Sequence, residues 1–319
     1  MVRYLKENDV RQLLTMQDAL AAVEQALKDR ALGLAVDIPR VRTHIREGTQ
    51  HVLQAAAPQL GYIGFKYYYT HARGKSMYVH LMDIASARLV AIIEADWMGI
   101  MRTGAASGVA SKYLANKGAS VLGQLGSGRQ SVGQIEAVCR ALGIRRAQVF
   151  SRTRDKLEAY CRTMSQKLGI EVVPAASGAA ALDGAHVVNV ITKSATPVLA
   201  GEWLQPGQHV NAAGSNALIR RELDEAAVQR CDLVTVDARG TAENECGDLL
   251  PAVEKGLLHW ETLTEIGDVI AGRAAGRSSP QQITLYESHG MGIQDIYVCA
   301  RLLALARERG VGADLPIGD

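Results

Sequence analysis

The stretch that decides the fold reads Gly126-Ser127-Gly128-Arg129-Gln130. An apolar run at residues 120–125 predicts a strand before it, and residues 130–142 predict a helix after it. In such a loop the first glycine permits a tight turn, and the second lets the backbone approach a pyrophosphate that the helix N-terminus attracts. Because of this context, we expect a dinucleotide-binding loop and not an ordinary strand-to-helix turn.

Strands and helices alternate from residue 119 onward. The predicted strands cover residues 120–125, 147–151, 171–174, 186–191, 209–213 and 233–236. Helices fit between several of them, notably at residues 130–142 and 153–168. Alternation is typical of a parallel sheet with helices on both faces, and short apolar runs suit strands that are covered on both sides. We predict an α/β fold with a Rossmann-type doubly wound parallel sheet.

The chain before this region has a different pattern. A capping box at Thr15-Met16-Gln17-Asp18 predicts the start of a helix. Predicted strands follow at residues 52–56, 61–69, 77–82 and 88–94. Closely spaced strands favour an antiparallel sheet. After about residue 283 we expect a strand and a final helix at 293–309, and we expect this end of the chain to return to the first domain.

A predicted helix at residues 103–114 is crowded with small residues, among them Gly104 and Gly108. Each glycine costs a helix up to about 1 kcal/mol relative to alanine. Two interpretations stay open: the helix approaches a backbone or a ligand closely, or it only packs tightly on a sheet.

Bulk properties exclude several classes of function. The chain has 319 residues and a formal net charge of +2, so bulk charge indicates neither a nucleic-acid partner nor a membrane surface. No apolar run approaches the ~20 residues of a membrane-spanning helix, and no signal peptide is visible. The 5 cysteines are scattered without a CxxC pair, which indicates reduced thiols, a cytoplasmic protein and no structural zinc, and nothing in the sequence supports a metal site.

The end of the second parallel strand bears on the choice of dinucleotide. Sites that prefer NAD usually place a carboxylate there for the ribose hydroxyl. This chain reads Ser151-Arg152-Thr153 after the strand, and the first carboxylate that follows the strand is that of Asp155. Arg152 with its two hydroxyl neighbours suits a 2′-phosphate, so we favour NADP(H) as the cofactor, with NAD(H) as the alternative.

With these motifs in place, the sequence resembles the ornithine cyclodeaminase/mu-crystallin family over nearly its whole length. The matching stretches include Pro39-Arg40-Val41, Gly64-Phe65-Lys66-Tyr67, Arg102-Thr103-Gly104, the glycine loop, Val210-Asn211-Ala212-Ala213-Gly214, Arg221-Glu222-Leu223-Asp224 and Gly292-Ile293-Gln294-Asp295. The resemblance implies a homodimer. It also implies a discontinuous α+β domain for substrate binding and dimerisation, residues 1–116 and 290–319, around a Rossmann domain at 117–289.

The family chemistry is hydride exchange between a nicotinamide and the α-carbon of an amino or imino acid. The resemblance gives Arg40 and Arg102 the role of binding the substrate carboxylate, which suits the paired donors of a guanidinium. It makes Lys66 the active-site lysine, and two neighbouring arginines should lower the pKa of its amine. We therefore assign catalysis to Lys66 and Arg102, and substrate binding to both together with Arg40.

The sequence departs from the cyclodeaminases at Gly214-Ser215-Asn216. Cyclodeaminases carry an aspartate in this loop, and an asparagine cannot act as a carboxylate base. We therefore favour a reductase or dehydrogenase, with Asn216 as a candidate substrate contact.

The turn before the last helix contains His289 and Met291, and in the family it lies against the nicotinamide. His289 is a candidate acid, base or substrate contact, although a lone histidine is more often structural. The predicted cofactor contacts are Thr103, Gly126, Ser127, Gly128, Arg129, Gln130, Ser151, Arg152, Thr153, Ser215 and Met291.

The leading hypothesis is an NAD(P)H-dependent reductase of a small α-imino acid, which in reverse is an amino-acid dehydrogenase. One alternative is a cyclodeaminase of ornithine or lysine type with tightly bound NAD. Another is a non-catalytic protein that binds NADPH or a small ligand.

Overall fold

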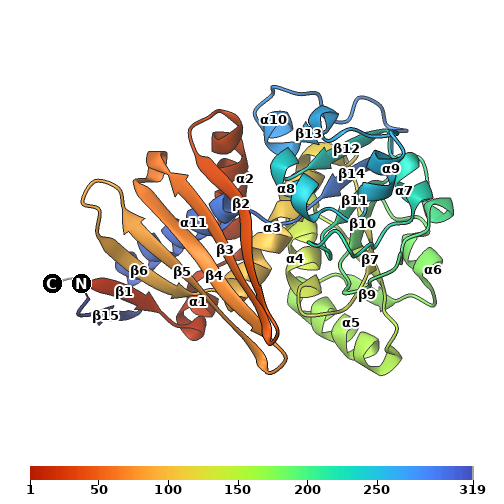
Figure 1. Cartoon of the computed structure of the whole chain (residues 1–319). Coiled ribbons are helices and arrows are strands. Elements are labelled where there is room, and N and C mark those ends of the chain that lie inside the picture. Colours follow the sequence, from red (N-terminus) through yellow and green to blue (C-terminus); the bar gives the residue numbers. More distant parts are fainter. Residues whose placement is uncertain (318–319) are drawn as a thin grey trace. The chain divides into compact units, whose positions relative to one another are not determined.

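The computed structural model describes residues 1–317. The chain forms two compact units: unit 1 is Met1–Arg102 together with the segment from Met291 onward, and unit 2 is Thr103–Gly290. Each unit is built on its own sheet (Figure 1). Helix α3 (Asp96–Leu114) contains the boundary between the units. Within the described residues, no helix is both long and apolar enough to cross a membrane.

Unit 1 has a seven-stranded sheet in the order β15-β1-β6-β5-β4-β3-β2. Strands β1 and β6 are parallel, and the other neighbours are antiparallel. Its elements are β1 (Val2–Leu5), α1 (Glu7–Leu13), α2 (Met16–Ala31), β2 (Val36–Ile45), β3 (Gly48–Ala57), the 3-10 turn η1 (Pro58–Leu60), β4 (Tyr62–His71), β5 (Gly74–Asp83), β6 (Leu89–Glu94), α11 (Gly292–Arg309) and β15 (Ala313–Leu315).

Strands β3, β4 and β5 are longer than the sequence predicts, β6 is one residue shorter, and three strands of unit 1 were not predicted at all. Strand β1 precedes the first helix, β15 follows the last one, and β2 lies at an edge of the sheet. The β2–β3 register shifts between Ile38 and Val41, around Pro39. Such a shift interrupts the alternation of inward and outward residues by which a strand is predicted.

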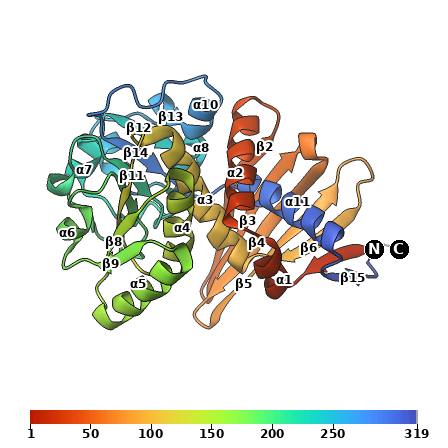
Figure 2. The same cartoon turned by 180° about the vertical axis from the view of Figure 1, so that it is seen from behind.

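Helix α11 packs on one face of the unit 1 sheet, and α2 packs against α11 (Figure 2). The Asp37 carboxylate of β2 accepts a hydrogen bond of 2.8 Å from the Ile293 N–H, which satisfies a free donor at the start of α11. A Cβ on Gly292 would meet the backbone of Gln54 at 2.9 Å, so the helix start lies directly on β3. Two anchors therefore fix the first turn of α11 against the sheet.

Unit 2 confirms the predicted doubly wound parallel sheet. Its eight strands run in the order β13-β12-β14-β11-β10-β7-β8-β9, and every neighbouring pair is parallel. The strand order reverses between β7 and β10, where a ligand crevice is expected in such sheets.

The strands of unit 2 are β7 (Val121–Leu125), β8 (Arg146–Phe150), β9 (Glu171–Pro174), β10 (Val187–Val190), β11 (His209–Ala212), β12 (Leu233–Val236), β13 (Thr264–Glu265) and β14 (Thr284–Glu287). The helices are α4 (Ser131–Leu142), α5 (Arg154–Leu168), α6 (Gly178–Leu182), α7 (Glu225–Gln229), α8 (Arg239–Glu245), α9 (Leu250–Glu254) and α10 (Ile266–Ile270), with the 3-10 turns η2 (Gly201–Trp203) and η3 (Trp260–Thr262).

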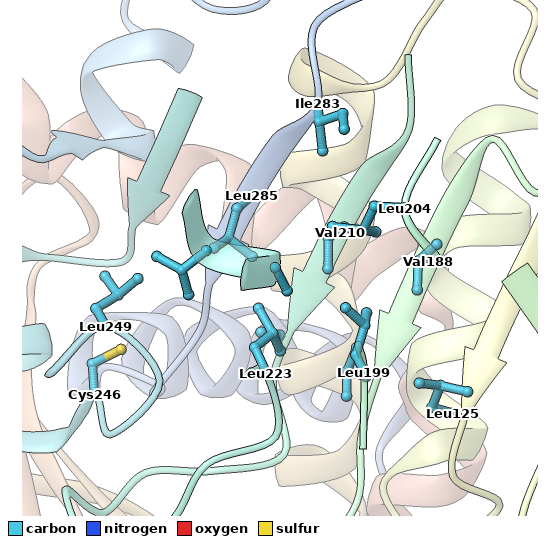
Figure 3. Packing of buried hydrophobic residues seen from close by; sticks show 14 of the residues in the cluster. Leu125, Val188, Leu199, Leu204, Val210, Leu223, Cys246, Leu249, Ile283 and Leu285 are labelled. Carbon is cyan, nitrogen blue, oxygen red and sulfur yellow. The ribbon is translucent and has the colours of Figure 1, made fainter. Parts of the chain in front are cut away.

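Separate apolar clusters cover the two faces of this sheet. One contains Val188, Val210 and Leu285 from neighbouring strands, and Figure 3 shows them with other members of the cluster such as Leu199 and Leu223. The other contains Val187 and packs under α4 and α5. Because Val187 and Val188 point to opposite faces, β10 is apolar on both sides and shows no alternation.

The small residues of α3 allow a close backbone contact within unit 2. A Cβ on Gly104 would lie 2.1 Å from the carbonyl oxygen of Gly133 in α4. Further along the helix, the Ser111 hydroxyl accepts a hydrogen bond of 2.9 Å from the Asn211 side chain of β11. Of the two interpretations left open, close approach to a backbone is confirmed at Gly104.

Candidate active site

Lys66 lies on the face of β4 that α11 covers. Its neighbour on that face, Gly64, faces α11 so closely that a Cβ would meet the Ile296 side chain at 3.1 Å. Lys66 is only 1% exposed. Its Nζ lies 2.7 Å from Oδ1 and 2.6 Å from Oδ2 of Asp295, a fully buried residue in the first turn of α11. The anchored helix start therefore places a carboxylate on the lysine.

Arg102 uses the same carboxylate. Its Nε lies 2.9 Å from Asp295 Oδ1, and its Nη1 donates a hydrogen bond of 3.2 Å to the Gln294 side-chain oxygen. Arg102 is 7% exposed. The structure thus brings Lys66 and Arg102 together through Asp295, within unit 1.

Burial and neighbouring cations change the acidity of Lys66. They lower the pKa of its amine from 10.5 to about 7. Burial has the largest effect, the Arg102 charge adds to it, the Asp295 carboxylate opposes it, and Arg40 lowers the pKa further. Three basic groups around one carboxylate leave an excess of positive charge that an anion can neutralise. With a pKa near neutrality, Lys66 can also exchange a proton at ordinary pH.

Arg40 and His51 extend this basic region across the sheet. Arg40 lies in β2 beside the register shift and is 9% exposed. The His51 ring stacks on Tyr68 with a centroid distance of 4.3 Å. Burial, with charges led by that of Arg40, lowers the pKa of His51 to about 4. His51 is therefore a neutral stacked ring near neutral pH, and the excess charge comes from the arginines and Lys66.

The predicted phosphate loop follows β7 in unit 2. Gly126 has φ of 111°, and a Cβ there would lie 2.3 Å from the Ile191 carbonyl oxygen of the β10 end, so only glycine fits. Gly128 is exposed, and a Cβ there would meet nothing within 4 Å. Ser131 takes the place of a third glycine and donates its hydroxyl to the Gly128 carbonyl oxygen. The loop therefore leaves open space beside Gly128, at the start of α4.

The predicted ribose segment lies beside this loop. The Gly126 N–H donates a hydrogen bond of 2.9 Å to the carbonyl oxygen of Phe150, the last residue of β8. Arg152 and Thr153 follow and are exposed, and Ser151 is half-buried. Arg129 and Gln130 lie on the loop itself, Arg129 exposed and Gln130 half-buried.

The loop after β11 holds the next candidates. Ser215 is buried and Asn216 is half-buried. Gly214 is required here because a Cβ would lie 2.0 Å from the carboxylate of Glu222, which also accepts a hydrogen bond of 2.6 Å from the Thr192 N–H after β10. Burial raises the pKa of Glu222 to about 7. Glu222 thus ties the ends of two central strands together.

The turn after β14 is held by another buried carboxylate. Asp237 accepts hydrogen bonds of 2.7 Å from both the His289 and the Gly290 N–H groups. His289 is 4% exposed, and its Nε2 lies 3.9 Å from Glu287 Oε2. Burial and neighbouring carboxylates raise the pKa of Glu287 well above its ordinary value. The structure thus places His289 beside the carboxyl groups of Asp237 and Glu287, which we call the acidic corner of unit 2.

Two further candidates flank the boundary between the units. Thr103 begins unit 2, is half-buried, and accepts a hydrogen bond of 3.2 Å from Gln134 on its carbonyl oxygen. Met291 precedes α11 and is 1% exposed.

Sequence reasoning did not identify Gln294, Glu222 or Asp237 as parts of the site, and it named Asp295 only within a stretch that resembles the family. The first two lie in stretches that resemble the family, so the motif gave their position without their contacts. Asp237 directly follows β12, where the carboxyl end of a parallel strand is a general place for functional side chains.

Comparisons with known proteins find relatives that match nearly the whole chain. The sequence pattern of the ornithine cyclodeaminase/mu-crystallin family matches residues 2–308. A Delta(1)-pyrroline-2-carboxylate reductase of Bacillus cereus is 31% identical over 320 residues, 97% of this chain and 98% of the relative.

Solved structures are similar over the same length. The Delta(1)-pyrroline-2-carboxylate reductase of Thermococcus litoralis, in complex with NADH and L-proline, has a TM-score of 0.94 at 28% identity, covering 98% of this chain and 100% of that chain. An archaeal alanine dehydrogenase dimer with bound NAD has a TM-score of 0.92 at 28% identity, covering 99% of each chain.

Proposed function

Because the chain belongs to the ornithine cyclodeaminase/mu-crystallin family, we propose that it is an NAD(P)H-dependent reductase of a small α-imino acid, which in reverse is an amino-acid dehydrogenase. The observation that carries the proposal is the buried group of Lys66, Arg102 and Asp295. The relatives named above reduce a cyclic imino acid or oxidise an amino acid, which is the chemistry that this group suits.

Arg40 and Arg102 bind the substrate carboxylate. Asp295 neutralises one of the three basic groups, and a substrate carboxylate neutralises another. Asp295 also fixes the guanidinium of Arg102 through Nε, so the group is oriented before a substrate arrives.

Lys66 holds the proton that the substrate nitrogen needs. Protonation of a C=N bond makes its carbon electrophilic, and an amine with a pKa of about 7 can release a proton near neutral pH. Burial keeps bulk water from the amine, which strengthens its electrostatic effect on a bound substrate.

Unit 2 is proposed to bind the dinucleotide, which supplies a hydride when bound. The open space at Gly128 and the start of α4 suit a pyrophosphate, with Ser127, Arg129 and Gln130 around it. Thr103, Ser215 and Met291 remain proposed cofactor contacts, and Asn216 and His289 proposed substrate contacts. Exposed Arg152, with Ser151 and Thr153, supports NADP(H) over NAD(H).

A homodimer completes the proposal. The archaeal alanine dehydrogenase is a dimer. The face of the unit 1 sheet opposite α11 carries half-buried aromatic rings, among them Phe65 and Tyr67. A second copy of the chain is the partner that we propose for this face.

The deciding experiment mixes purified protein with NADPH or NADH and a panel of cyclic and acyclic imino acids, including keto acid and ammonium pairs. We expect cofactor oxidation with at least one substrate, and a loss of about a hundredfold or more in Lys66→Ala. The exposed Lys75→Ala on the neighbouring strand is the matched control and should keep full turnover.

Other outcomes decide against a reductase. Ammonia release from a diamino acid without net change in NADH absorbance would indicate a cyclodeaminase. A protein that binds the cofactor but is inert across the whole panel would indicate a binding protein.

A further inference from the structure

We propose that Cys246, Glu287 and His289 form a binding site for a zinc-like divalent cation in unit 2. One candidate ligand atom from each residue lies within 4.8 Å of the other two, and all three residues are buried. The proposal does not depend on the reductase activity.

The chain holds these side chains in place before any ion arrives. Glu287 ends β14 and His289 follows two residues later. Asp237 fixes the turn through the His289 and Gly290 N–H groups, at 2.7 Å each. Cys246 directly follows α8 and belongs to the apolar cluster of unit 2, where Figure 3 shows it beside Leu249. The three ligands therefore come from ordered segments.

The spacing suits a tetrahedral ion. Zinc binds thiolate sulfur at about 2.3 Å and imidazole nitrogen or carboxylate oxygen at about 2.0–2.2 Å, so its ligands lie roughly 3.5 Å apart. The distance from His289 Nε2 to Glu287 Oε2 is already 3.9 Å. Small side-chain rotations would bring the atoms to bonding distance.

Glu287 lies among other acidic side chains. The largest charge effects on Glu287 come from three other carboxylates, those of Asp248, Glu222 and Asp237. Glu287 is 2% exposed, and its Oε1 has no hydrogen-bond partner among the described residues. Burial of a carboxyl oxygen without a partner is costly, and a divalent cation that displaces the protons of Glu287 and of the Cys246 thiol would satisfy it.

The donor set selects the kind of ion. Thiolate and imidazole ligands favour zinc and similar borderline metals over magnesium or calcium, which prefer oxygen ligands. Three protein ligands leave a fourth position open, as in sites where zinc contacts water or a ligand.

Cobalt substitution tests the site directly. The full-length protein, stripped with a chelator, is titrated with Co²⁺, and the zinc content of untreated protein is measured by mass spectrometry. We expect one ion per chain, a thiolate-to-cobalt absorption band in the near ultraviolet, and the visible bands of four-coordinate cobalt. Cys246→Ser should abolish the near-ultraviolet band, and His289→Asn should weaken cobalt binding at least tenfold.

Cys231→Ser is the matched control, since Cys231 is a partly buried thiol of the same unit, and it should keep the band. Thermal melting identifies which variants are folded. If one of Cys246→Ser and His289→Asn does not fold, the other still tests the site. Folded wild type without stoichiometric metal and without the band overturns the proposal. Retention of the band in Cys246→Ser, or its loss in Cys231→Ser, also overturns it.

Discussion

At Lys66 the structure balances burial against a single carboxylate. Burial and two arginines favour the neutral amine, and Asp295 favours the charged one. The amine has a pKa of about 7 because Asp295 offsets only part of the lowering by burial and the arginines. Asp295 is therefore a positioning residue that also sets the proton affinity of the group it holds.

The pH dependence of imine reduction should report this balance. If protonated Lys66 is the active form, kcat/KM stays level below pH 7 and falls about tenfold per pH unit above it. Asp295→Asn removes the group that raises the pKa of the amine, so the falling limb should move to lower pH. Steady-state rates measured between pH 5 and about 9 give both profiles.

An unshifted limb in Asp295→Asn, with only a lower maximum, would mean that Asp295 matters for structure alone. Asp268→Asn is a suitable control. Asp268 is a carboxylate of unit 2 that pairs with Arg273, and its loss should leave the profile unchanged.

In the proposed NADP(H) site, the choice between NADPH and NADH depends on one side chain, that of Arg152. A charge-assisted hydrogen bond contributes about 1.5–3 kcal/mol, so Arg152→Ala should raise KM for NADPH about tenfold to a hundredfold. KM for NADH should change little, because NADH has no 2′-phosphate. Arg154→Ala is the control, since Arg154 is also exposed and pairs with Glu158 at 3.4 Å. Equal effects of Arg152→Ala on both cofactors would contradict an NADP(H) site.

At the scale of elements, we expect one glycine, Gly104, to matter for stability and another, Gly128, to matter for dinucleotide binding. Gly104 lets α3 lie against the α4 backbone, whereas Gly128 faces open space in the phosphate loop. Gly104→Ala should destabilise the protein by about 1–3 kcal/mol, because backbone atoms cannot yield as a side chain can. Gly128→Ala should leave stability within about 0.5 kcal/mol and weaken dinucleotide binding at least tenfold.

Urea unfolding and NADH titration of both variants check this contrast. A stable Gly104→Ala would mean that α3 and α4 can separate without cost. Full cofactor affinity in Gly128→Ala would mean that the pyrophosphate does not approach this loop.

The elements differ in how well the sequence predicts them. Strands such as β7 and β10 are short apolar runs between turns, and buried parallel strands leave that signal. Strand β2 does not, because the register shift near Pro39 breaks its alternation and its outer residues are exposed. A strand at an edge with a bulge carries little hydrophobic pattern, so it was missed.

At the scale of the whole molecule, the site depends on contacts that no local pattern specifies. Lys66 and Asp295 are 229 residues apart, and Arg102 and Gln294 are 192 apart. The residue types and the family resemblance predicted the basic groups. The carboxylate that joins them follows only from α11 returning to the unit 1 sheet, and the acidic corner of unit 2 follows only from the neighbouring ends of its parallel strands.

Helix α11 covers one face of the unit 1 sheet, and we propose that the opposite face binds a second copy of the chain. On this face Phe65 and His80 have ring centroids 5.1 Å apart, and those of Tyr67 and Tyr78 are 5.7 Å apart. Nearby on the edge strand, Val41 is 51% exposed. Aromatic rings are enriched in the buried centres of protein interfaces.

We therefore expect sedimentation to show a dimer, and Tyr67→Glu to weaken it at least tenfold. In a twofold interface each substitution counts twice, and a buried unpaired carboxylate is costly. Leu257→Glu is the control, because Leu257 is an apolar side chain of unit 2 that is 55% exposed. Its dimer should sediment as the wild type does. If Tyr67→Glu remains fully dimeric at nanomolar concentration while Leu257→Glu dissociates, the interface lies on unit 2 and not on this sheet.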